Sequence, residues 1–104
     1  MAQFRLIFDK IILKQLRKSA KSPNVKTILV KMLDKIEDLG PECGKLIDSR
    51  LFLYELKNKH PPIRLYFKYN KITNEIYIFE FEIKSSEKKQ QSTIEKIKRK
   101  FLKF

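Results

Sequence analysis

Apolar residues in the first forty positions recur every three or four residues, which is the spacing that places side chains on one face of an α-helix. A first set comprises Ile11, Ile12, Leu16 and Ala20, and a second comprises Val25, Ile28, Leu29, Met32, Leu33, Ile36 and Leu39. Ser22-Pro23 separates the two sets, because serine favours a helix N-cap and proline fits the first helical position. Gly40-Pro41 ends the second set. The pattern predicts a helical hairpin, preceded at residues 3–8 by a short strand or by the run-in to the first helix.

After a predicted loop at residues 41–49, β-branched and aromatic residues alternate with polar ones. Three predicted strands, Leu51–Lys57, Ile63–Tyr69 and Glu75–Lys84, are joined by segments short enough for hairpins, which predicts a three-stranded antiparallel meander. A final stripe at residues 94, 97, 101 and 104 predicts a basic C-terminal helix over 86–104. The expected fold class is α+β. A single domain, residues 1–104, would pack the helical hairpin on a small twisted antiparallel sheet.

Alternation along the three strands sorts their side chains onto two faces of the sheet. The face expected to pack on the hairpin carries Phe52, Tyr54, Leu56, Ile63, Leu65, Phe67, Tyr69, Tyr77, Phe79, Phe81 and Ile83. The other face would carry Glu55, Lys57, Arg64, Tyr66, Lys68, Glu80, Glu82 and Lys84, with Leu51, Leu53, Ile76 and Ile78 toward the strand beginnings. This second face is either an ordinary solvated sheet with Lys/Glu pairs or a site that grips or cleaves a phosphodiester.

Cleavage of RNA by its own 2′-hydroxyl requires a proton acceptor, a cation that stabilises the charged phosphorane, and a proton donor. The planar guanidinium of Arg64 can hold two phosphate oxygens. Lys57, Lys84 or Glu80 could transfer protons if their surroundings shift their pKa values, and Tyr66 could stack on a base or donate its hydroxyl. His60 follows the first strand in a predicted turn. It is either a proton-transfer residue, since imidazole titrates near neutral pH, or an exposed turn residue.

The composition adds a strong positive charge and excludes several kinds of site. The 24 Lys and Arg outnumber the 12 Asp and Glu, and the cations gather at the two ends of the chain, with nine in residues 1–35 and eight in residues 84–104. Such a distribution favours a polyanion partner. One cysteine, Cys43, and one histidine cannot form an internal disulfide or a four-ligand zinc site. No apolar run approaches the ~20 residues of a membrane span. We expect a cytoplasmic protein without metal, cofactor or membrane partner.

Residues 45–91 carry three motifs in a recognisable order: Leu53–Lys57 (LYELK), Ile63–Phe67 (IRLYF), and a hydrophobic strand that runs into Lys84 and a Lys/Gln-rich segment. In this order and spacing they resemble the HigB-like, phage-derived branch of the RelE/ParE toxin superfamily. The resemblance implies the toxin of a type II toxin–antitoxin pair, a metal-independent endoribonuclease that cuts mRNA in the ribosomal A site and blocks translation. Its partners would be mRNA, the ribosome and a small helix-turn-helix antitoxin.

The residues implied by this resemblance and by the charge pattern fall into three groups. The expected catalytic set is Lys57, His60, Arg64 and Lys84, and the expected RNA-binding set is Tyr66, Lys68, Lys88, Lys89, Lys96 and Arg99. Glu55, Glu80 and Glu82 are expected as proton-transfer or structural partners. The basic C-terminal helix itself could be a solvated face, an RNA contact or a membrane-surface helix, of which packing on its own sheet is favoured over lipid.

Two positions depart from the pattern of RelE proper. Glu55 stands where RelE proper has a second lysine, and no tyrosine follows Tyr77, so a C-terminal catalytic tyrosine is missing. Two alternatives therefore stay open beside the ribonuclease. One is a ParE-like toxin that poisons DNA gyrase, and the other is a catalytically inactive relative that binds RNA or the ribosome through its basic surface.

Overall fold

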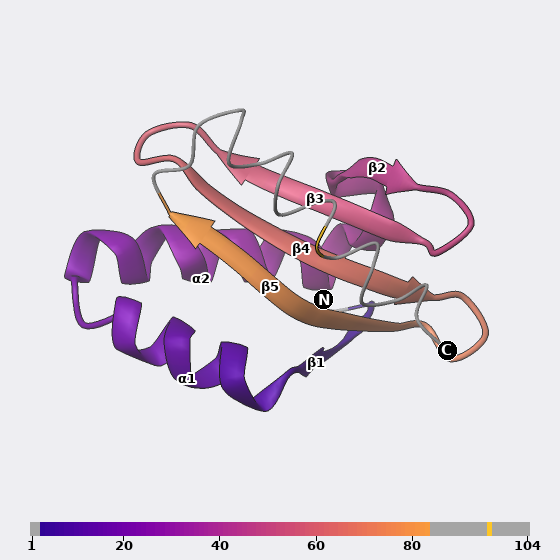
Figure 1. Cartoon of the computed structure of the whole chain (residues 1–104), viewed down its shortest axis with the longest axis horizontal. Helices are drawn as coiled ribbons and strands as arrows, with labels where there is room; N and C mark the ends of the chain where they lie inside the picture. The colour runs from indigo at the N-terminus through magenta and orange to yellow at the C-terminus, as the bar shows by residue number, and fades with distance from the viewer. Residues whose placement is uncertain (1–2, 84–95, 97–104) are drawn as a thin grey trace.

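The computed structural model of the chain describes residues 3–83 and Lys96. Along the chain the elements are β1 (Arg5–Phe8), α1 (Lys10–Ser19), α2 (Pro23–Leu39), a short 3-10 helix η1 (Gly40–Cys43), β2 (Lys45–Asp48), β3 (Leu53–Asn58), β4 (Ile63–Asn70) and β5 (Glu75–Ile83). The strands form one sheet in the order β1-β5-β4-β3-β2. Both helices lie on one side of this sheet (Figure 1). The fold is therefore α+β, as expected.

The helical hairpin begins and ends close to the expected residues. Asp9 caps α1, since its Oδ2 accepts hydrogen bonds from two backbone amides of the first turn at 3.1 and 3.2 Å. Helix α2 begins at Pro23, and Ser22 occupies the N-cap position without a side-chain capping bond. Gly40 ends α2 with a φ of +59°, and the ring of Phe4 fills the space that a Cβ at this position would need. The close approach and the positive φ both require glycine there.

The main core lies between the helices and the sheet. Its buried residues are Ile12, Leu16, Leu29, Met32 and Ile36 from the helices and Leu56, Ile63, Leu65, Phe67, Ile76 and Ile78 from the strands. A second, smaller apolar cluster of Leu53, Tyr66 and Phe79 lies on the opposite face of the sheet. The central strand β4 is consequently buried over five consecutive residues, Ile63–Phe67, because its side chains are covered on both faces.

The antiparallel meander of β3, β4 and β5 is confirmed, but the sheet is larger than expected and is not wholly antiparallel. Strand β1 pairs with β5 in parallel, and β2 forms within the predicted loop, antiparallel to β3. Strand β2 is a four-residue edge strand with a register irregularity, and its first two residues are exposed, so it leaves little hydrophobic signal. Phe52, expected within a strand, lies in the preceding turn with a φ of 53°.

A β-bulge at Phe79 interrupts the alternation of β5. Tyr66 of β4 pairs with Glu80, whereas the next residue, Phe67, pairs with Ile78, so β5 contains one residue more than its partner at this point. A bulge of this kind leaves the extra residue without a partner in the ladder and changes which side chains share a face.

The bulge makes the expected face assignment wrong for the first half of β5. Ile76 and Ile78 pack against the helices, whereas Phe79 and Tyr77 join the cluster on the opposite face. Beyond the bulge, Phe81 packs toward the helical side as expected. Regular alternation could not reveal this, because a single inserted residue inverts the pattern for every residue before it.

Most of the predicted C-terminal helix, residues 86–104, lies outside the described residues; Lys96 alone is described, in a helical conformation. Within the described part of the chain, no helix combines the length and the apolar character that crossing a bilayer requires.

The corrected orientation of β5 has a measurable consequence for stability. Ile78 is fully buried in the main core, so Ile78→Ala should lower the free energy of unfolding by about 2–5 kcal/mol through lost burial and a residual cavity. Ile72, which is 91% exposed, provides the matched control, and Ile72→Ala should change stability by less than about 0.5 kcal/mol. Urea unfolding followed by circular dichroism measures both. Equal, small effects of the two substitutions would contradict the placement of Ile78.

Candidate functional site

The sheet face opposite the helices, called here the polar face, is organised in rows of directly paired residues from β3, β4 and β5. The rows are Lys57–Arg64–Glu82, Glu55–Tyr66–Glu80 and Leu53–Lys68–Tyr77. Directly paired residues of neighbouring strands project from the same face with their Cβ atoms about 5 Å apart. The register therefore brings Lys57 and Arg64 side by side and gathers the expected residues of these three strands on one surface.

Arg64 is held inside this face rather than exposed on it. Its side chain is 5% exposed, and its Nε lies 3.9 Å from Oε1 of Glu55, whose side chain is 6% exposed. A charge so far from water is tolerated only beside an opposite charge. Glu55 thus acts in this chain as a counter-ion for Arg64.

Tyr66 and Glu82 form a second buried pair. The Tyr66 hydroxyl donates a 2.6 Å hydrogen bond to Oε1 of Glu82, and the tyrosine is fully buried. Burial, followed by the hydrogen bond and the negative charge of Glu82, raises the pKa of Tyr66 far above the ordinary tyrosine value. Tyr66 therefore stays protonated at neutral pH, and in this position it has no exposed ring on which a base could stack.

The remaining expected residues are more accessible. Lys57 is exposed, and so is His60 in the β3–β4 turn, which follows the Asn58–Ile63 pair. Lys68 and Glu80 are half-buried. Lys96, whose side chain is 72% exposed, lies with its Nζ 3.6 Å from Oε2 of Glu80.

Four expected cationic residues, Lys84, Lys88, Lys89 and Arg99, lie outside the described residues.

The expectation of a solvent-exposed cluster of mixed charge is therefore only partly met. Glu55, Arg64, Tyr66 and Glu82 are buried, and Tyr66 packs with the apolar Leu53 and Phe79. In the Lys57–Arg64–Glu82 row, Lys57 is exposed whereas Arg64 and Glu82 are buried. In the ranges 3–83 and 96, no three His, Cys, Asp or Glu side chains are grouped so that they could bind a metal ion.

Two features of this face were missed by the sequence analysis. Asp9, the N-cap of α1, accepts a 3.1 Å hydrogen bond from the Tyr77 hydroxyl through its Oδ1, and burial together with this carboxylate raises the pKa of Tyr77. A pocket of about 400 Å³ also opens beyond the Lys68–Tyr77 row, with Phe52 and Lys71 in its walls. The reversed orientation of Tyr77 and the turn position of Phe52 concealed both features in the sequence.

No protein-family model and no curated protein matches the chain, but several solved structures share its fold, among them the three that follow. The isolated E. coli RelE toxin aligns with a TM-score of 0.64 and 19% identity, covering 91% of this chain and 99% of that chain. A free E. coli RelE with two arginines replaced by alanine gives 0.63 and 20%, covering 93% and 99%. The intact E. coli RelBE toxin–antitoxin complex gives 0.62 and 19%, covering 81% and 100%. This chain thus has a RelE-like fold.

Removing the buried guanidinium should cost stability. Arg64→Ala leaves the carboxylate of Glu55 buried without its counter-ion, so we expect the free energy of unfolding to fall by about 3–5 kcal/mol. Arg64→Lys keeps the positive charge and should cost clearly less. Urea unfolding of the two variants beside the wild type measures the difference, and equal stability of Arg64→Ala and wild type would contradict the buried ion pair.

The raised pKa of Tyr66 predicts a pH dependence of stability. An unfolded tyrosine loses its proton near pH 10, whereas the folded chain retains it. The contribution of Tyr66 is therefore complete below pH 10 and is lost as pH rises further, by about 1.4 kcal/mol per pH unit. Above pH 10 the stability of the wild type should fall more steeply than that of Tyr66→Phe by this amount. Urea unfolding at several pH values between 8 and 11 measures the two slopes, and parallel curves would refute the assignment.

Proposed function

We propose that this chain is the toxin of a type II toxin–antitoxin pair and that it cleaves mRNA at the ribosome. The observation that carries the proposal is the β3–β4 register, which places Lys57 directly opposite Arg64 on the polar face of a RelE-like sheet. The likeness of residues 45–91 to the HigB-like branch supports the same function and suggests where in the superfamily the chain belongs.

The proposed reaction uses the RNA itself as the nucleophile and needs no metal ion. The 2′-oxygen attacks the adjacent phosphorus as its proton passes to a base, and the 5′-oxygen leaves and takes up a proton. Holding the 2′-oxygen in line with the leaving oxygen is an orientation effect that can contribute about 7–11 kcal/mol. We assign that orientation to the ribosome, which leaves charge stabilisation and proton transfer to the toxin.

Lys57 and Arg64 are proposed to supply the positive charge. Lys57 is exposed and can contact a phosphate oxygen directly. Arg64 lies beneath the surface, where the lower dielectric strengthens its field on a phosphorane bound beside Lys57. Glu55 offsets part of this charge, so Lys57 should contribute most of the charge stabilisation.

His60 is the proposed proton-transfer residue. It is exposed in the turn that follows the Asn58–Ile63 pair, one pair beyond the Lys57–Arg64 row, and imidazole is the side chain most often used for general acid–base catalysis. Glu82 is an alternative acceptor, because its Oε2 is buried with no hydrogen-bond donor among residues 3–83 and 96. Lys84, which directly follows Ile83 in the sequence and lies outside the described residues, is a further candidate for proton transfer.

The proposed partners follow from the charge of the chain and from its structural neighbours. A net charge of +12 suits contacts with mRNA and ribosomal RNA that weaken as salt rises. One neighbour is a toxin–antitoxin complex, and we propose a small helix-turn-helix antitoxin with an acidic or amphipathic segment for this chain. A reading frame for such a protein beside the gene would support the pairing.

One structural observation favours a second candidate function. In the three rows, the cations Lys57, Arg64 and Lys68 face an equal number of glutamates, and Arg64 is already engaged by Glu55. A face with this charge balance also fits a catalytically inactive, non-toxic relative that binds RNA or the ribosome through its basic surface. The test below separates the two functions.

Inducible expression in bacteria, with primer-extension mapping of translated transcripts, tests the ribonuclease. The wild type should arrest growth and produce cuts within translated regions. Lys57→Ala should reduce cleavage by about 100-fold, the usual effect of removing one group that stabilises the transition-state charge. His60→Gln should also reduce cleavage, and Arg64→Lys serves in place of Arg64→Ala because it preserves the buried charge.

Lys14→Ala is the matched control, since Lys14 is exposed on α1 and carries the same charge. It should cleave like the wild type. Growth arrest with double-strand DNA breaks and intact transcripts would instead indicate a ParE-like gyrase poison. Absence of both toxicity and cleavage at full expression would indicate the inactive relative, and full cleavage by Lys57→Ala would refute the assigned site.

A further inference from the structure

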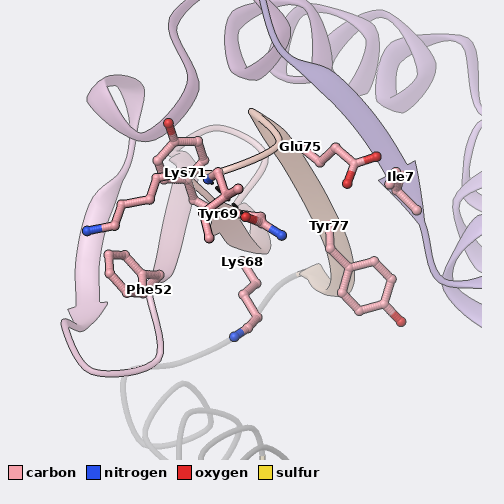
Figure 2. A pocket seen from close by; sticks show the side chains of 9 residues that line it. Ile7, Phe52, Lys68, Tyr69, Lys71, Glu75 and Tyr77 are labelled. Atoms are coloured by element: carbon pink, nitrogen blue, oxygen red, sulfur yellow. Dashed lines mark hydrogen bonds between the residues drawn. The ribbon is translucent and has the colours of Figure 1, made fainter.

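The pocket beyond the Lys68–Tyr77 row lies on the same surface as the Lys57–Arg64 row. It has a volume of about 400 Å³. Figure 2 shows Phe52 and Lys71 on one side of it, Tyr77 and Glu75 on the other, and Lys68 between them. Lys68 follows Arg64 by four residues on β4, which places the pocket about 13 Å along the strand from the candidate catalytic row.

Aromatic rings form walls of this pocket. Phe52 and Tyr77 are both half-buried, so part of each side chain is accessible from the pocket. The Tyr77 ring is fixed by the hydrogen bond from its hydroxyl to Asp9. Phe52 is held in the left-handed backbone region, with a φ of 53°. A bulky residue rarely adopts this conformation, and such strain gathers at functional sites.

Two lysines give the pocket a positive charge. The Nζ of Lys71 lies 5.3 Å from the centre of the Phe52 ring, a cation–π contact that keeps the ammonium at the pocket. Lys68 adds a second positive charge between the two sides of the pocket. The one carboxylate among the described lining residues, Glu75, is paired with Arg5 of β1 at 3.7 Å. The net charge at the opening therefore favours an anion.

We propose that this pocket binds a nucleobase of single-stranded RNA, with the base on the Phe52 and Tyr77 rings and the flanking phosphates at Lys68 and Lys71. The identification of RNA as the ligand rests on the function proposed above. Aromatic walls combined with lysines are the usual means of holding unpaired nucleotides. The pocket would hold a base a few nucleotides from the cleaved phosphate, and it would thereby set the register of the strand on the polar face.

Binding of a short unstructured RNA to the purified chain tests this site. The probe is a fluorescent six-nucleotide RNA, and its comparison is an oligonucleotide of the same length and charge that lacks the bases. Because stacking on one aromatic residue contributes a factor of about 5 to 150 in affinity, the wild type should prefer the intact RNA by about 5-fold or more. Phe52→Gly should remove most of this preference, since glycine accepts the left-handed backbone and only the ring is lost.

A second pair of variants tests the phosphate contacts. The double variant Lys68→Ala/Lys71→Ala should weaken binding of both oligonucleotides and reduce the slope of log affinity against log salt by about 0.7 per lysine. The controls are Lys14→Ala for charge and Val30→Ala for an apolar residue exposed elsewhere, on α2. Both should bind like the wild type, and circular dichroism melting confirms the fold of every variant.

The outcomes distinguish a failure of the nucleobase site from a failure of the proposed ribonuclease function. If Phe52→Gly binds the intact RNA like the wild type, or if the wild type does not distinguish the two oligonucleotides, the nucleobase site is refuted, whatever the cleavage assay gives. If base preference is lost in Phe52→Gly while no transcript is cleaved in cells, the site stands and the ribonuclease proposal fails. Displacement of bound RNA by an acidic peptide, without any base preference, would identify a protein partner in the pocket and overturn the proposal.

Discussion

The register of the central strand β4 is the constraint on which both the core and the candidate site depend. Its residues Ile63, Leu65 and Phe67 enter the core beneath the helices, whereas Arg64, Tyr66 and Lys68 project from the polar face. A slip of one residue would exchange the two sets and place a guanidinium against α2. The apolar burial that stabilises the domain therefore also fixes the side chains of the candidate site. A substitution in the core can therefore displace the side chains of the candidate site through the backbone of β4, although the substituted residue does not contact them.

The polar face combines buried charge with an exposed cation. Arg64 and Glu55 form one buried pair and Tyr66 and Glu82 another, and neighbouring rows bring the two pairs together. Each partner is costly to remove because the other would then be left in a low dielectric. Lys57 stands at the edge of this network with its ammonium in water. The buried charges are thus held in fixed positions, and the ammonium of Lys57 is the charge of this network that a ligand can reach. Such an arrangement would suit binding of a ligand whose own conformation is fixed by other contacts.

The sequence predicted the parts of this structure that repeat with a regular period. The two helices and the strands β3, β4 and β5 followed from apolar spacing, and the placement of Lys57 and Arg64 on one face of the sheet followed from alternation along their strands. Their direct pairing came only from the structure. Strand β2 and the parallel pairing of β1 were not predicted, because edge strands of four residues carry little periodic signal. The burial of Arg64 was also missed, since a buried arginine depends on a partner from another strand, and charged residues are seldom found inside.

The bulge at Phe79 explains how one strand serves both the candidate catalytic rows and the pocket. In a regular strand, residues 77 and 82 are an odd number of positions apart, and their side chains would project from opposite faces. The extra residue between Ile78 and Glu80 changes that parity, so Tyr77 pairs with Lys68 while Glu82 pairs with Arg64 on the same surface. Bulges are frequent beside functional sites, where they re-aim side chains. Without this one, the aromatic wall of the pocket would lie inside the helical core, and the polar face would end at the Glu55–Tyr66–Glu80 row.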